Sequence, residues 1–385
     1  MKLLSKLDPR RLNGKTVLLR IDLNVEPGMP IDSYRVAGVL PTIKLLRKAG
    51  ATVVILSHRG RPTLPPDKKR TGRSADWTQF SENRGLSLRP FATLLSTKLS
   101  SPVRFLAYEE MHSHKLREQV RIKGGVVLFE NLRFHPGEER DDAKFAKFLA
   151  KLGDLYVNDA FAVSHRANAS VHALTKLLPS YAGLRLEREL AALAAVLGRV
   201  VHPVTLIIGG AKVADKIGMV ERFGKTADHI LLAGGPANTF FSASKLPVGD
   251  SVVDVESLPF AKKNLKNPKV VLPVDVKVHA RRILDVGERT VALFAEIVER
   301  SGTIVWNGPL GLFEQRTYAH GTMGLWQAIA RNRKAVTVVG GGETIASLAL
   351  VPDLKLPQNV FLSTGGGAML EFLAGKKLPG IQALK

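Results

Sequence analysis

"VVGGGETIA", residues 338–346, places three glycines and one acid between two stretches of opposite character. The β-branched residues before the glycines favour a strand, and the small residues after Glu343 favour a helix. A glycine-rich turn between a strand and a helix lets a phosphate approach the backbone amides of the helix. The stretch therefore predicts an α/β fold with an anion-binding turn, and it leaves open what the carboxylate of Glu343 does there.

The same alternation of apolar runs and longer amphipathic stretches continues along the chain of 385 residues. Strands that alternate with helices favour βαβ units and parallel sheets, and this length exceeds what one hydrophobic core usually supports. We therefore expect an α/β fold of two lobes, each a doubly wound, mostly parallel sheet flanked by helices. The runs predicted as strands are "TVLLRID", "TVVILSH", "VRFLAY", "GVVLFEN", "DLYVNDA", "VTLIIGG", "HILLAGG", "KVVLPVD", "TIVWNG", "AVTVVGGG" and "VFLSTGGG".

Amphipathic stretches supply the expected helices. "RVAGVLPTIKLLRKAG" begins at Arg35, and "KFAKFLAKLG" ends at Gly153, which we expect to cap its helix. "LRLEREL", residues 184–190, is continuously helical in pattern, and we expect it to join the lobes as a hinge helix. The predicted domains are residues 1–183, together with the C-terminal tail 376–385, and residues 184–375.

The residues that follow the predicted strands differ between the two halves. Ligands of an open parallel sheet bind beyond the carboxyl ends of its strands. In the first half these ends carry arginine, histidine and acids, which suit a compact oxyanion. In the second half they carry glycine, which suits the phosphates and the flat base of a nucleotide. The sequence thus predicts one domain for a small anion, one for a nucleotide, and group transfer between them.

Composition narrows the class of protein. The absence of cysteine excludes disulfides and thiolate chemistry, and no apolar run reaches the ~18–20 residues that span a bilayer. We therefore expect a soluble, cytoplasmic protein. The 56 Lys and Arg residues against 34 acids give a formal net charge of +22, a field that attracts phosphorylated metabolites, nucleotides or nucleic acid. The densest basic run, "PPDKKRTGR" at residues 65–73, reads as a loop, and nucleic-acid binding remains an alternative.

Two segments place lysine close after glycine, and only the second predicts an anion-binding site. "GKT" at residues 14–16 is not a P-loop, because Pro9 stands where that motif requires glycine. "GGAKVADK", residues 209–216, follows a predicted strand and spaces Lys212 and Lys216 four residues apart. We expect both lysines on one face of the following helix, directed at an anion over its N-terminus.

Motifs distributed along nearly the whole chain resemble those of the phosphoglycerate kinase family and occur in the family's order. They are "LRIDLNV", "SHRGRP", "ENLRFHPGEE", "YVNDAF" with "SHRA", "GGAKVADKI", "GGPANTF", "LPVDV", "IVWNGPLGLFE", "GGGET", "STGGGAMLEFL" and "GKKLPGIQAL". The resemblance implies reversible phosphoryl transfer from 1,3-bisphosphoglycerate to magnesium ADP, giving 3-phosphoglycerate and ATP in glycolysis. It also implies a monomer with small-molecule substrates and no membrane partner.

The resemblance assigns roles to residues of both halves. The phosphoglycerate site would comprise Asp22, Asn24, Arg35, His58, Arg61, Arg133 and Arg166. The nucleotide site would comprise Gly210, Lys212, Lys216, Gly234, Gly235, Asn307, Glu314, Gly341, Gly342, Glu343 and Thr344. Arg35, Lys212, Gly342 and Gly366 would act on the transferred group. A hard cation such as Mg²⁺ prefers a carboxylate and phosphate oxygens, so Glu343 is the expected metal ligand; the alternative is an ordinary acidic helix cap.

Several positions depart from the family's usual pattern: Glu26, Ala162, Val163, Asn168, Pro236 and Glu343, the last in place of aspartate. None of them removes a residue that the resemblance assigns to phosphoryl transfer itself. Besides an active kinase, three alternatives remain open. These are a catalytically degenerate homologue, a basic nucleic-acid-binding protein, and a nucleotide-binding protein that acts on another acyl phosphate or carboxylate.

Overall fold

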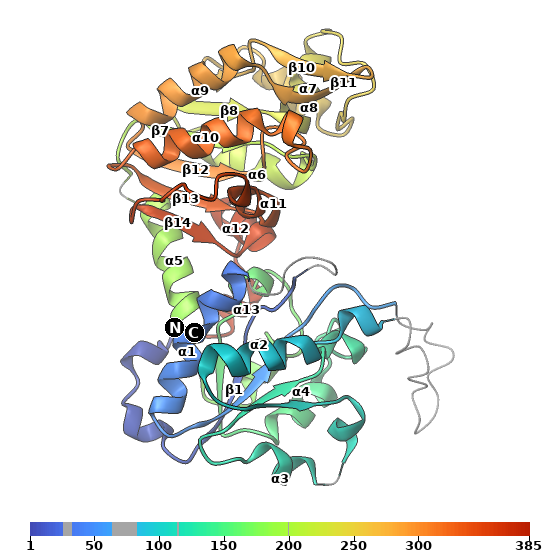
Figure 1. Cartoon of the computed structure of the whole chain (residues 1–385), viewed down its shortest axis with the longest axis vertical. Helices are drawn as coiled ribbons and strands as arrows, with labels where there is room; N and C mark the ends of the chain where they lie inside the picture. The colour runs from blue at the N-terminus through green and yellow to red at the C-terminus, as the bar shows by residue number, and fades with distance from the viewer. Residues whose placement is uncertain (26–32, 64–82, 114, 199) are drawn as a thin grey trace. The chain divides into compact units, whose positions relative to one another are not determined.

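The computed structural model of the protein describes residues 1–25, 33–63, 83–113, 115–198 and 200–385 (Figure 1). Glu26 and the basic run 65–73 lie outside these ranges. The chain divides into two compact units, which we call unit 1 (Met1–Arg188 with Lys377–Lys385) and unit 2 (Glu189–Lys376). The sequence analysis places its breaks after residues 183 and 375, and the units divide after Arg188 and Lys376.

Unit 1 is built on a six-stranded sheet in the order β3-β4-β2-β1-β5-β6, and all neighbouring strands are parallel. Side chains of β1, β2 and β4 are buried along their whole lengths, as in a sheet covered on both faces. The strands are β1 Thr16–Arg20, β2 Thr52–Leu56, β3 Val103–Leu106, β4 Val126–Phe129, β5 Leu155–Asn158 and β6 Ser180–Ala182.

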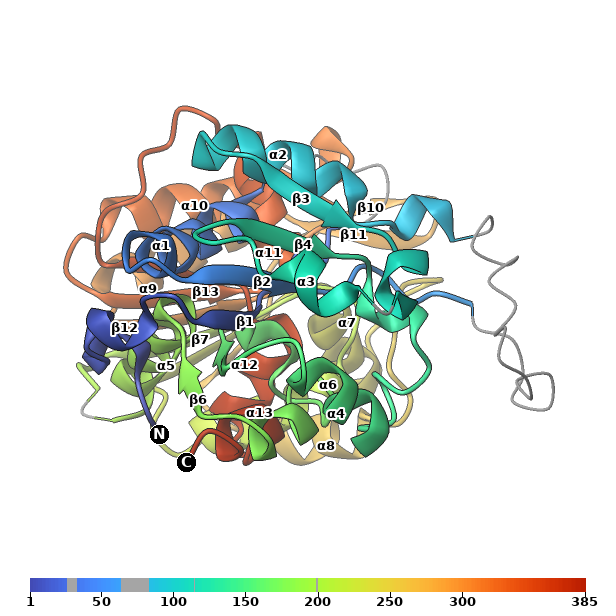
Figure 2. The same ribbon diagram turned by 90° about the horizontal axis from the view of Figure 1, so that it is seen from below.

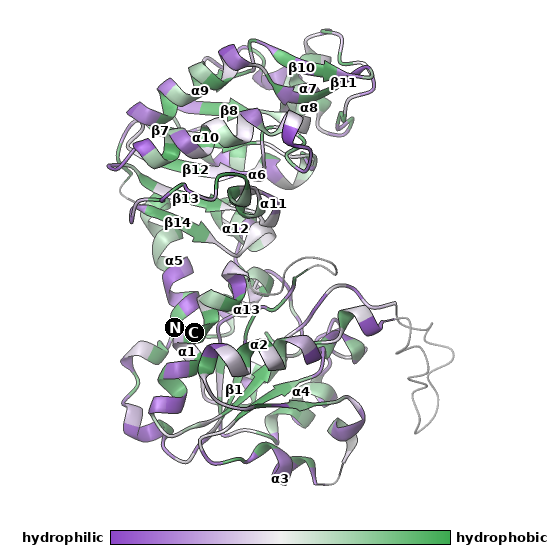
Figure 3. Ribbon diagram, in the orientation of Figure 1, coloured by the Kyte–Doolittle hydropathy of each residue, from purple (hydrophilic) through white to green (hydrophobic). Residues whose placement is uncertain are grey.

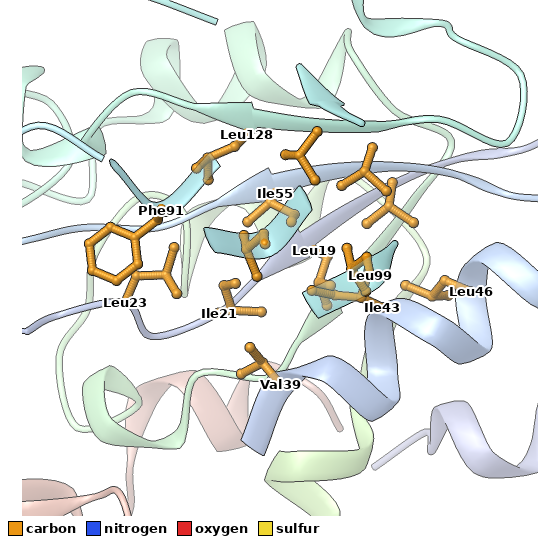
Figure 4. Packing of buried hydrophobic residues seen from close by; sticks show 14 of the residues in the cluster. Leu19, Ile21, Leu23, Val39, Ile43, Leu46, Ile55, Phe91, Leu99 and Leu128 are labelled. Atoms are coloured by element: carbon orange, nitrogen blue, oxygen red, sulfur yellow. The ribbon is translucent and has the colours of Figure 1, made fainter. Parts of the chain in front are cut away.

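Helices cover both faces of this sheet. Helices α1 and α2 lie on one face and α4 on the other (Figure 2). Alternate residues of β1 and β2 pack against α1 and α2, and Leu19, Ile43 and Ile55 meet in this layer (Figure 4). The helices of unit 1 are α1 Tyr34–Lys48, α2 Arg89–Leu99, α3 Leu116–Val120, α4 Ala143–Ala150 and α13 Pro379–Gln382.

Unit 2 repeats the architecture with a six-stranded parallel sheet in the order β14-β13-β12-β7-β8-β9. Trp306 of β12 and Trp326 of α10 meet edge to face in its core, with ring centroids 4.6 Å apart. The strands are β7 Val204–Ile208, β8 His229–Leu232, β9 Val270–Val271, β12 Thr303–Asn307, β13 Val336–Gly340 and β14 Val360–Ser363, and an antiparallel hairpin pairs β10 Val276–His279 with β11 Arg282–Val286.

The helices of unit 2 carry polar outer faces, whereas the strands are hydrophobic (Figure 3). Helix α5, Leu184–Leu197, begins in unit 1 and ends in unit 2. The others are α6 Ala214–Phe223, α7 Gly234–Ala243, α8 Leu258–Asn264, α9 Glu288–Arg300, α10 His320–Arg331, α11 Gly342–Ala346 and α12 Gly366–Leu373. Within the described ranges, no helix combines the length and the apolar character that crossing a bilayer requires.

The predicted α/β fold with two doubly wound parallel sheets is confirmed, while some strands were not predicted and one expected helix cap is wrong. Strand β6 and hairpin β10–β11 were not expected from the sequence, because these strands lack a continuous apolar run. Gly153 does not cap α4: the helix ends at Ala150, and its C-cap is Lys151 in a right-handed conformation. A Cβ at Gly153 would instead lie 2.6 Å from Cγ of Leu18 in β1, so glycine serves the close packing of this turn on the sheet.

We expect Gly153→Ala to destabilise unit 1 by about 1–3 kcal/mol, because the added methyl group overpacks the contact with Leu18. Thermal unfolding measures this as a lower melting temperature than that of the original protein. Gly85→Ala is the matched control, because a Cβ there meets no atom within 4 Å. Equal melting temperatures for the two variants would contradict this account of Gly153.

Candidate functional site

The carboxyl ends of four neighbouring strands of unit 1, in the order β4-β2-β1-β5, meet at one edge of the sheet. Asp22 and Asn24 follow β1, His58 and Arg61 follow β2, and Arg133 follows β4. Because these strands are parallel neighbours, side chains that lie far apart in the sequence reach the same edge. We call this set, together with Arg20, Arg35 and Arg166, the cationic edge.

His58 lies at the centre of the cationic edge and is only 1% exposed. Burial lowers the pKa of His58 well below its ordinary value of 6.5, and the positive charges of Arg20, Arg133, Arg35 and Arg166 lower it further. Nη2 of Arg20 lies 3.2 Å from Nδ1 of His58. Since a guanidinium group only donates hydrogen bonds, Nδ1 accepts, and the neutral ring carries its proton on Nε2.

Arg20 is a site residue that the sequence analysis missed. It is the last residue of β1 and is 1% exposed. Its Nη1 donates to the carbonyl of Ile21 (2.6 Å), its Nε donates to Oγ of Ser170 (2.8 Å), and its Nη2 lies 3.8 Å from Oε1 of Glu138. Arg20 could have been recognised from the sequence, because it is a charged residue inside the apolar run "TVLLRID". Arginine is almost never fully buried without partners.

Two of the predicted residues shape the cationic edge through contacts of their own. Asp22 forms an ion pair with Arg35 and accepts from the backbone amide of Asn24 at 2.9 Å. Oδ1 of Asn24 accepts from the amide of Gly60 at 2.8 Å, which ties the turn after β1 to the turn after β2. Asp22 therefore orients Arg35, and Asn24 orients the loop that carries Arg61.

Arg133 and Arg166 add charge beside His58, and Arg61 stands at the margin. Burial lowers the pKa of Arg133 to about 10, so this group stays protonated at neutral pH; its Nη1 donates to the carbonyl of Gly60 at 2.6 Å. Nε of Arg166 lies 3.2 Å from Nε2 of His165. Arg61 is exposed, close to the segment 64–82 that lies outside the described residues.

Three residues that differ from the family's usual pattern, at positions 162, 163 and 168, lie in the segment that carries Arg166. Val163 is buried against Ala160 and Val171, and its carbonyl accepts from the amide of Arg166 at 3.0 Å. Asn168 is 4% exposed, and its carbonyl accepts from the amides of residues 171 and 172. These residues thus stabilise the turn that holds Arg166 in place, and Ala162 lies half-buried within it.

In unit 2, glycine turns follow β7, β8 and β12 and bond to one another through the backbone. The amide of Gly209 donates to Asn307 (2.9 Å), that of Gly210 to Pro309 (2.7 Å), and that of Gly235 to Gly210 (2.9 Å). A Cβ at Gly209 would lie 2.1 Å from the carbonyl oxygen of Pro309, so no other residue fits there. The turns therefore form one continuous backbone wall.

This wall borders a pocket of about 200 Å³ in unit 2. Five of the residues predicted to bind nucleotide line it: Gly210, Gly234, Gly235, Glu314 and Glu343. Apolar side chains of Phe241, Leu310 and Leu312 supply further surface. A partly apolar pocket bounded by glycine backbone suits the base and the sugar of a nucleotide. Pro236, in the first turn of α7, is tolerated there because that position needs no amide donor.

The two predicted lysines behave differently from each other. Lys216, in α6, is 7% exposed, and its ammonium group donates to the carbonyl of Gly209. Lys212 is exposed and precedes α6, which begins at Ala214. The expectation of two lysines on one helical face is therefore wrong, since the residues after the glycines continue as a loop before the helix starts.

Asn307 and Thr344, also predicted to contact nucleotide, hold the glycine turn after β13. Nδ2 of Asn307 donates to the carbonyl of Gly340 at 3.0 Å, and Oγ1 of Thr344 accepts from the amide of Gly308 at 2.8 Å. Gly341, between them, has φ +102°, which favours glycine. A Cβ on Gly366, the first residue of α12, would have Cα of Gly341 as its nearest contact at 3.8 Å, so the glycine turns after β13 and β14 are neighbours.

Glu343 lies in the first turn of α11, one residue after Gly342, and its side chain is exposed at the pocket. Among the residues that the structure describes, no group of three or more His, Cys, Asp or Glu side chains is placed to hold a metal ion. Asp285, which the sequence analysis missed, also lines the pocket; it is 1% exposed and accepts from the amides of Gly321 (3.0 Å) and Val286 (2.9 Å). It therefore supports the pocket wall.

A small-anion edge in one α/β unit and a glycine-lined pocket in another indicate an α/β kinase that moves a phosphoryl group between a phosphorylated acid and a nucleotide. Comparison with known proteins identifies the particular kind: residues 7–376 match the family model "Phosphoglycerate kinase". The chain belongs to the phosphoglycerate kinase family.

Curated relatives and solved structures agree with this assignment. The chain is 40% identical over 412 residues to phosphoglycerate kinase of Methylorubrum extorquens strain PA1, covering 98% of this chain and 97% of the relative. It is also 40% identical over 399 residues to that of Thermomicrobium roseum, covering 96% of each. Phosphoglycerate kinase of Pyrococcus horikoshii OT3 superimposes with a TM-score of 0.84 at 31% identity, covering 100% of this chain and 98% of that structure. The Coxiella burnetii enzyme gives a TM-score of 0.77 at 35% identity, covering 99% and 98%.

The function that follows is reversible phosphoryl transfer between 1,3-bisphosphoglycerate and ADP, giving 3-phosphoglycerate and ATP in glycolysis. The enzyme is a kinase, and its substrates are small molecules. An active kinase is therefore favoured over the nucleic-acid-binding and acyl-phosphate alternatives.

The depressed pKa of His58 predicts a loss of stability in acid. The unfolded chain takes up a proton at this histidine as the pH falls below 6.5, whereas the folded protein does not. This difference in proton uptake leaves the free energy of unfolding unchanged above about pH 6.5. It lowers the free energy of unfolding as the pH falls from there toward the lower folded-state pKa. We expect His58→Gln, whose amide oxygen still accepts from Arg20, to lose less melting temperature than the original protein between about pH 7.5 and about pH 5.5. Identical declines in the two proteins would show that His58 does not titrate on unfolding.

Proposed function

We propose that the cationic edge of unit 1 binds the phosphoglycerate and that the pocket of unit 2 binds magnesium ADP or ATP. The observation that carries this division is the neutral, buried His58 among Arg20, Arg35, Arg133 and Arg166. Several guanidinium groups at one place are costly unless an anion with several charges occupies the site. A phosphorylated carboxylic acid supplies such an anion, and guanidinium groups bind both of its ends bidentately.

Within the cationic edge, the proposed ligands are Asp22, Asn24, Arg35, His58, Arg61, Arg133 and Arg166. His58 would donate from Nε2, since its Nδ1 is already bonded to Arg20. Asp22 and Asn24 would act through the residues that they orient as well as by direct contact. Arg35 would also stabilise the group in transfer, because its ion pair with Asp22 leaves other N–H donors of the guanidinium free to bind.

Within unit 2, we propose that Gly234 and Gly235 face the adenine and that Glu314 binds the ribose hydroxyls. Lys216 would bind nucleotide phosphates with its ammonium group, which the bond to the carbonyl of Gly209 holds beside the glycine turns. Gly210, Asn307, Gly341 and Thr344 would keep the glycine turns close to the phosphates. Lys212, exposed ahead of α6, has the freedom to follow the transferred group.

Transfer needs no base from the protein, because the attacking oxygen of ADP is already ionised. The chain positions the reactants and neutralises charge. Arg35, Lys212 and the amides of Gly342 and Gly366 would surround the phosphoryl group in flight. We also propose that α5 acts as the hinge between the units, and that the enzyme works in the cytoplasm as a monomer, as expected of a glycolytic kinase of this family.

Glu343 is the proposed ligand of Mg²⁺. An exposed carboxylate beside a phosphate-binding turn fits a hard cation that takes its remaining ligands from phosphate and water. When bound, the cation neutralises phosphate charge during transfer. The first experiment is a coupled assay with 3-phosphoglycerate and ATP, with and without Mg²⁺. Turnover that requires all three supports the proposal, and its absence in folded protein would indicate a catalytically degenerate homologue.

Removing the ammonium group of Lys212 tests whether this residue stabilises the transferred phosphoryl group. We expect Lys212→Ala to lower kcat about a hundredfold or more, because one charge-stabilising donor contributes ~3–4 kcal/mol to the transition state. Lys263→Ala is the control, since Lys263 is an exposed lysine on α8 of the same unit. A Lys212→Ala kcat within a few-fold of the original would refute the mechanism.

Substitutions of Glu343 test whether its carboxylate binds Mg²⁺ or only caps helix α11. We expect Glu343→Ala to lower turnover and to raise the Mg²⁺ concentration needed for half-maximal activity, and Glu343→Asp to stay active because it keeps a carboxylate. Titration of activity with MgCl₂ at saturating ATP measures both quantities. An alanine variant with an unchanged Mg²⁺ requirement would leave Glu343 as a cap only.

A further inference from the structure

Arg185, at the start of α5, is a buried cation that the proposed mechanism does not use. It is 6% exposed. Its Nη1 donates to the hydroxyl of Tyr34 at 3.0 Å, and its Cζ lies 4.9 Å from the centroid of the Tyr34 ring. Tyr34 is the first residue of α1. One side chain therefore reaches from the first turn of α5 to the first turn of α1 through a hydrogen bond and a cation–π contact.

Gly38 shows how closely this arginine packs on α1. A Cβ at Gly38 would lie 3.3 Å from Cδ and 3.4 Å from Nε of Arg185. Glycine in the interior of a helix is unfavourable relative to alanine, and here it leaves room for the arginine. Tyr34 and Gly38 are one helical turn apart, so the arginine side chain lies along the first turn of α1.

The backbone at Arg185 is fixed to the sheet. Oδ1 of Asp159, which follows β5, accepts from the amide of Arg185 at 2.7 Å and from that of Leu186 at 3.0 Å. Asp159 is 1% exposed. The first turn of α5 is thus capped by a residue of the sheet edge that carries the proposed substrate site, and Arg185 extends from this anchored point.

Among the described residues, the N-cap of α1 lacks the side-chain capping bond that Asp159 gives to α5. Ser33 is its N-cap residue, and the Ser33 side chain makes no capping hydrogen bond. Arg35 follows Tyr34 directly and pairs with Asp22. It also stands near enough to His58 to lower the pKa of that histidine, together with Arg20, Arg133 and Arg166. Repulsion from these cations opposes the position of Arg35.

We propose that Tyr34 and Arg185 form a clamp that positions Arg35 for the acid substrate and for the transferred phosphoryl group. By holding the first turn of α1 against the anchored start of α5, the clamp keeps the Arg35 guanidinium at the cationic edge despite like-charge repulsion. Tyr34 and Arg185 are positioning residues, because they act through Arg35. The inference rests on the proposed role of Arg35.

Steady-state kinetics with 3-phosphoglycerate and ATP test the clamp. We expect Arg185→Leu and Tyr34→Ala each to lower kcat/KM for 3-phosphoglycerate about tenfold, and the KM for ATP to stay within about twofold. Tyr34→Phe keeps the ring under the guanidinium, so we expect a loss of about two- to threefold. Arg188→Leu, an exposed arginine on the same helix, is the matched control and should match the original enzyme.

A double-mutant cycle links the clamp to Arg35. If Arg185 acts through Arg35, the variant Arg35→Ala/Arg185→Leu loses no more kcat/KM than Arg35→Ala alone. An additional tenfold loss in the double variant would overturn the clamp, because Arg185 would then act independently. Unchanged kinetics in Tyr34→Ala would also overturn it, even with a lowered melting temperature, since Arg185 would then serve only as charge or packing.

The same series separates failure of the clamp from failure of the proposed function. If Arg35→Ala keeps near-original turnover, the assigned role of Arg35 is wrong. If Arg35→Ala is inactive while Tyr34→Ala and Arg185→Leu are unaffected, the role of Arg35 stands and the clamp is wrong. Should Arg185→Leu fail to fold, the comparison of Tyr34→Phe with Tyr34→Ala decides, because both keep the charge of Arg185. Similar kinetics for these two tyrosine variants, both near the original, would reject the clamp.

Discussion

Repulsion among the guanidinium groups that surround His58 is the constraint around which unit 1 is organised. Burial and these positive charges both disfavour a proton on the imidazole, so the ring stays neutral and its hydrogen-bonding direction is set by Arg20. Among the described residues, acids balance only some of this positive charge. Glu138 lies near Arg20, Glu139 near Arg133 and Asp22 beside Arg35. The uncompensated remainder matches an anionic ligand, and it explains why so many neighbouring contacts in unit 1 serve to hold arginines in place.

Unit 2 differs from unit 1, because glycine backbone rather than charged side chains lies beside its pocket. The glycine turns after β7, β8 and β12 bond to one another, and the Cβ positions at Gly209 and Gly308 are filled by neighbouring backbone atoms. Such a wall resists collapse because each turn supports the next. It fixes the backbone beside the pocket, and fixed backbone dipoles need no reorganisation when charge moves during transfer.

Much of the fold and of the candidate site was predictable because local rules and tertiary structure agree there. Parallel strands buried on both faces read as apolar runs, and their carboxyl ends collect ligand-type residues whatever the intervening helices do. Arg20 and Arg185 were missed because their roles depend on partners far along the chain, Ser170 and Glu138 for one and Tyr34 for the other. The position of Lys212 was misjudged for a related reason. Helix spacing applies only after a helix has begun, and the start of α6 at Ala214 cannot be read from "GGAKVADK" alone.

The sequence "GGGET" places two kinds of polar residue side by side, and the structure separates their tasks. The hydroxyl of Thr344 is committed to the amide of Gly308, and Asn307 to the carbonyl of Gly340, so both are consumed in holding the turn. Glu343, next to Thr344 in the sequence, is exposed and lines the pocket. A carboxylate at this position repels bare phosphates but attracts a divalent cation that accompanies them. This charge is the reason we propose that the turn binds a nucleotide together with its metal, and the turn sets the position of the carboxylate.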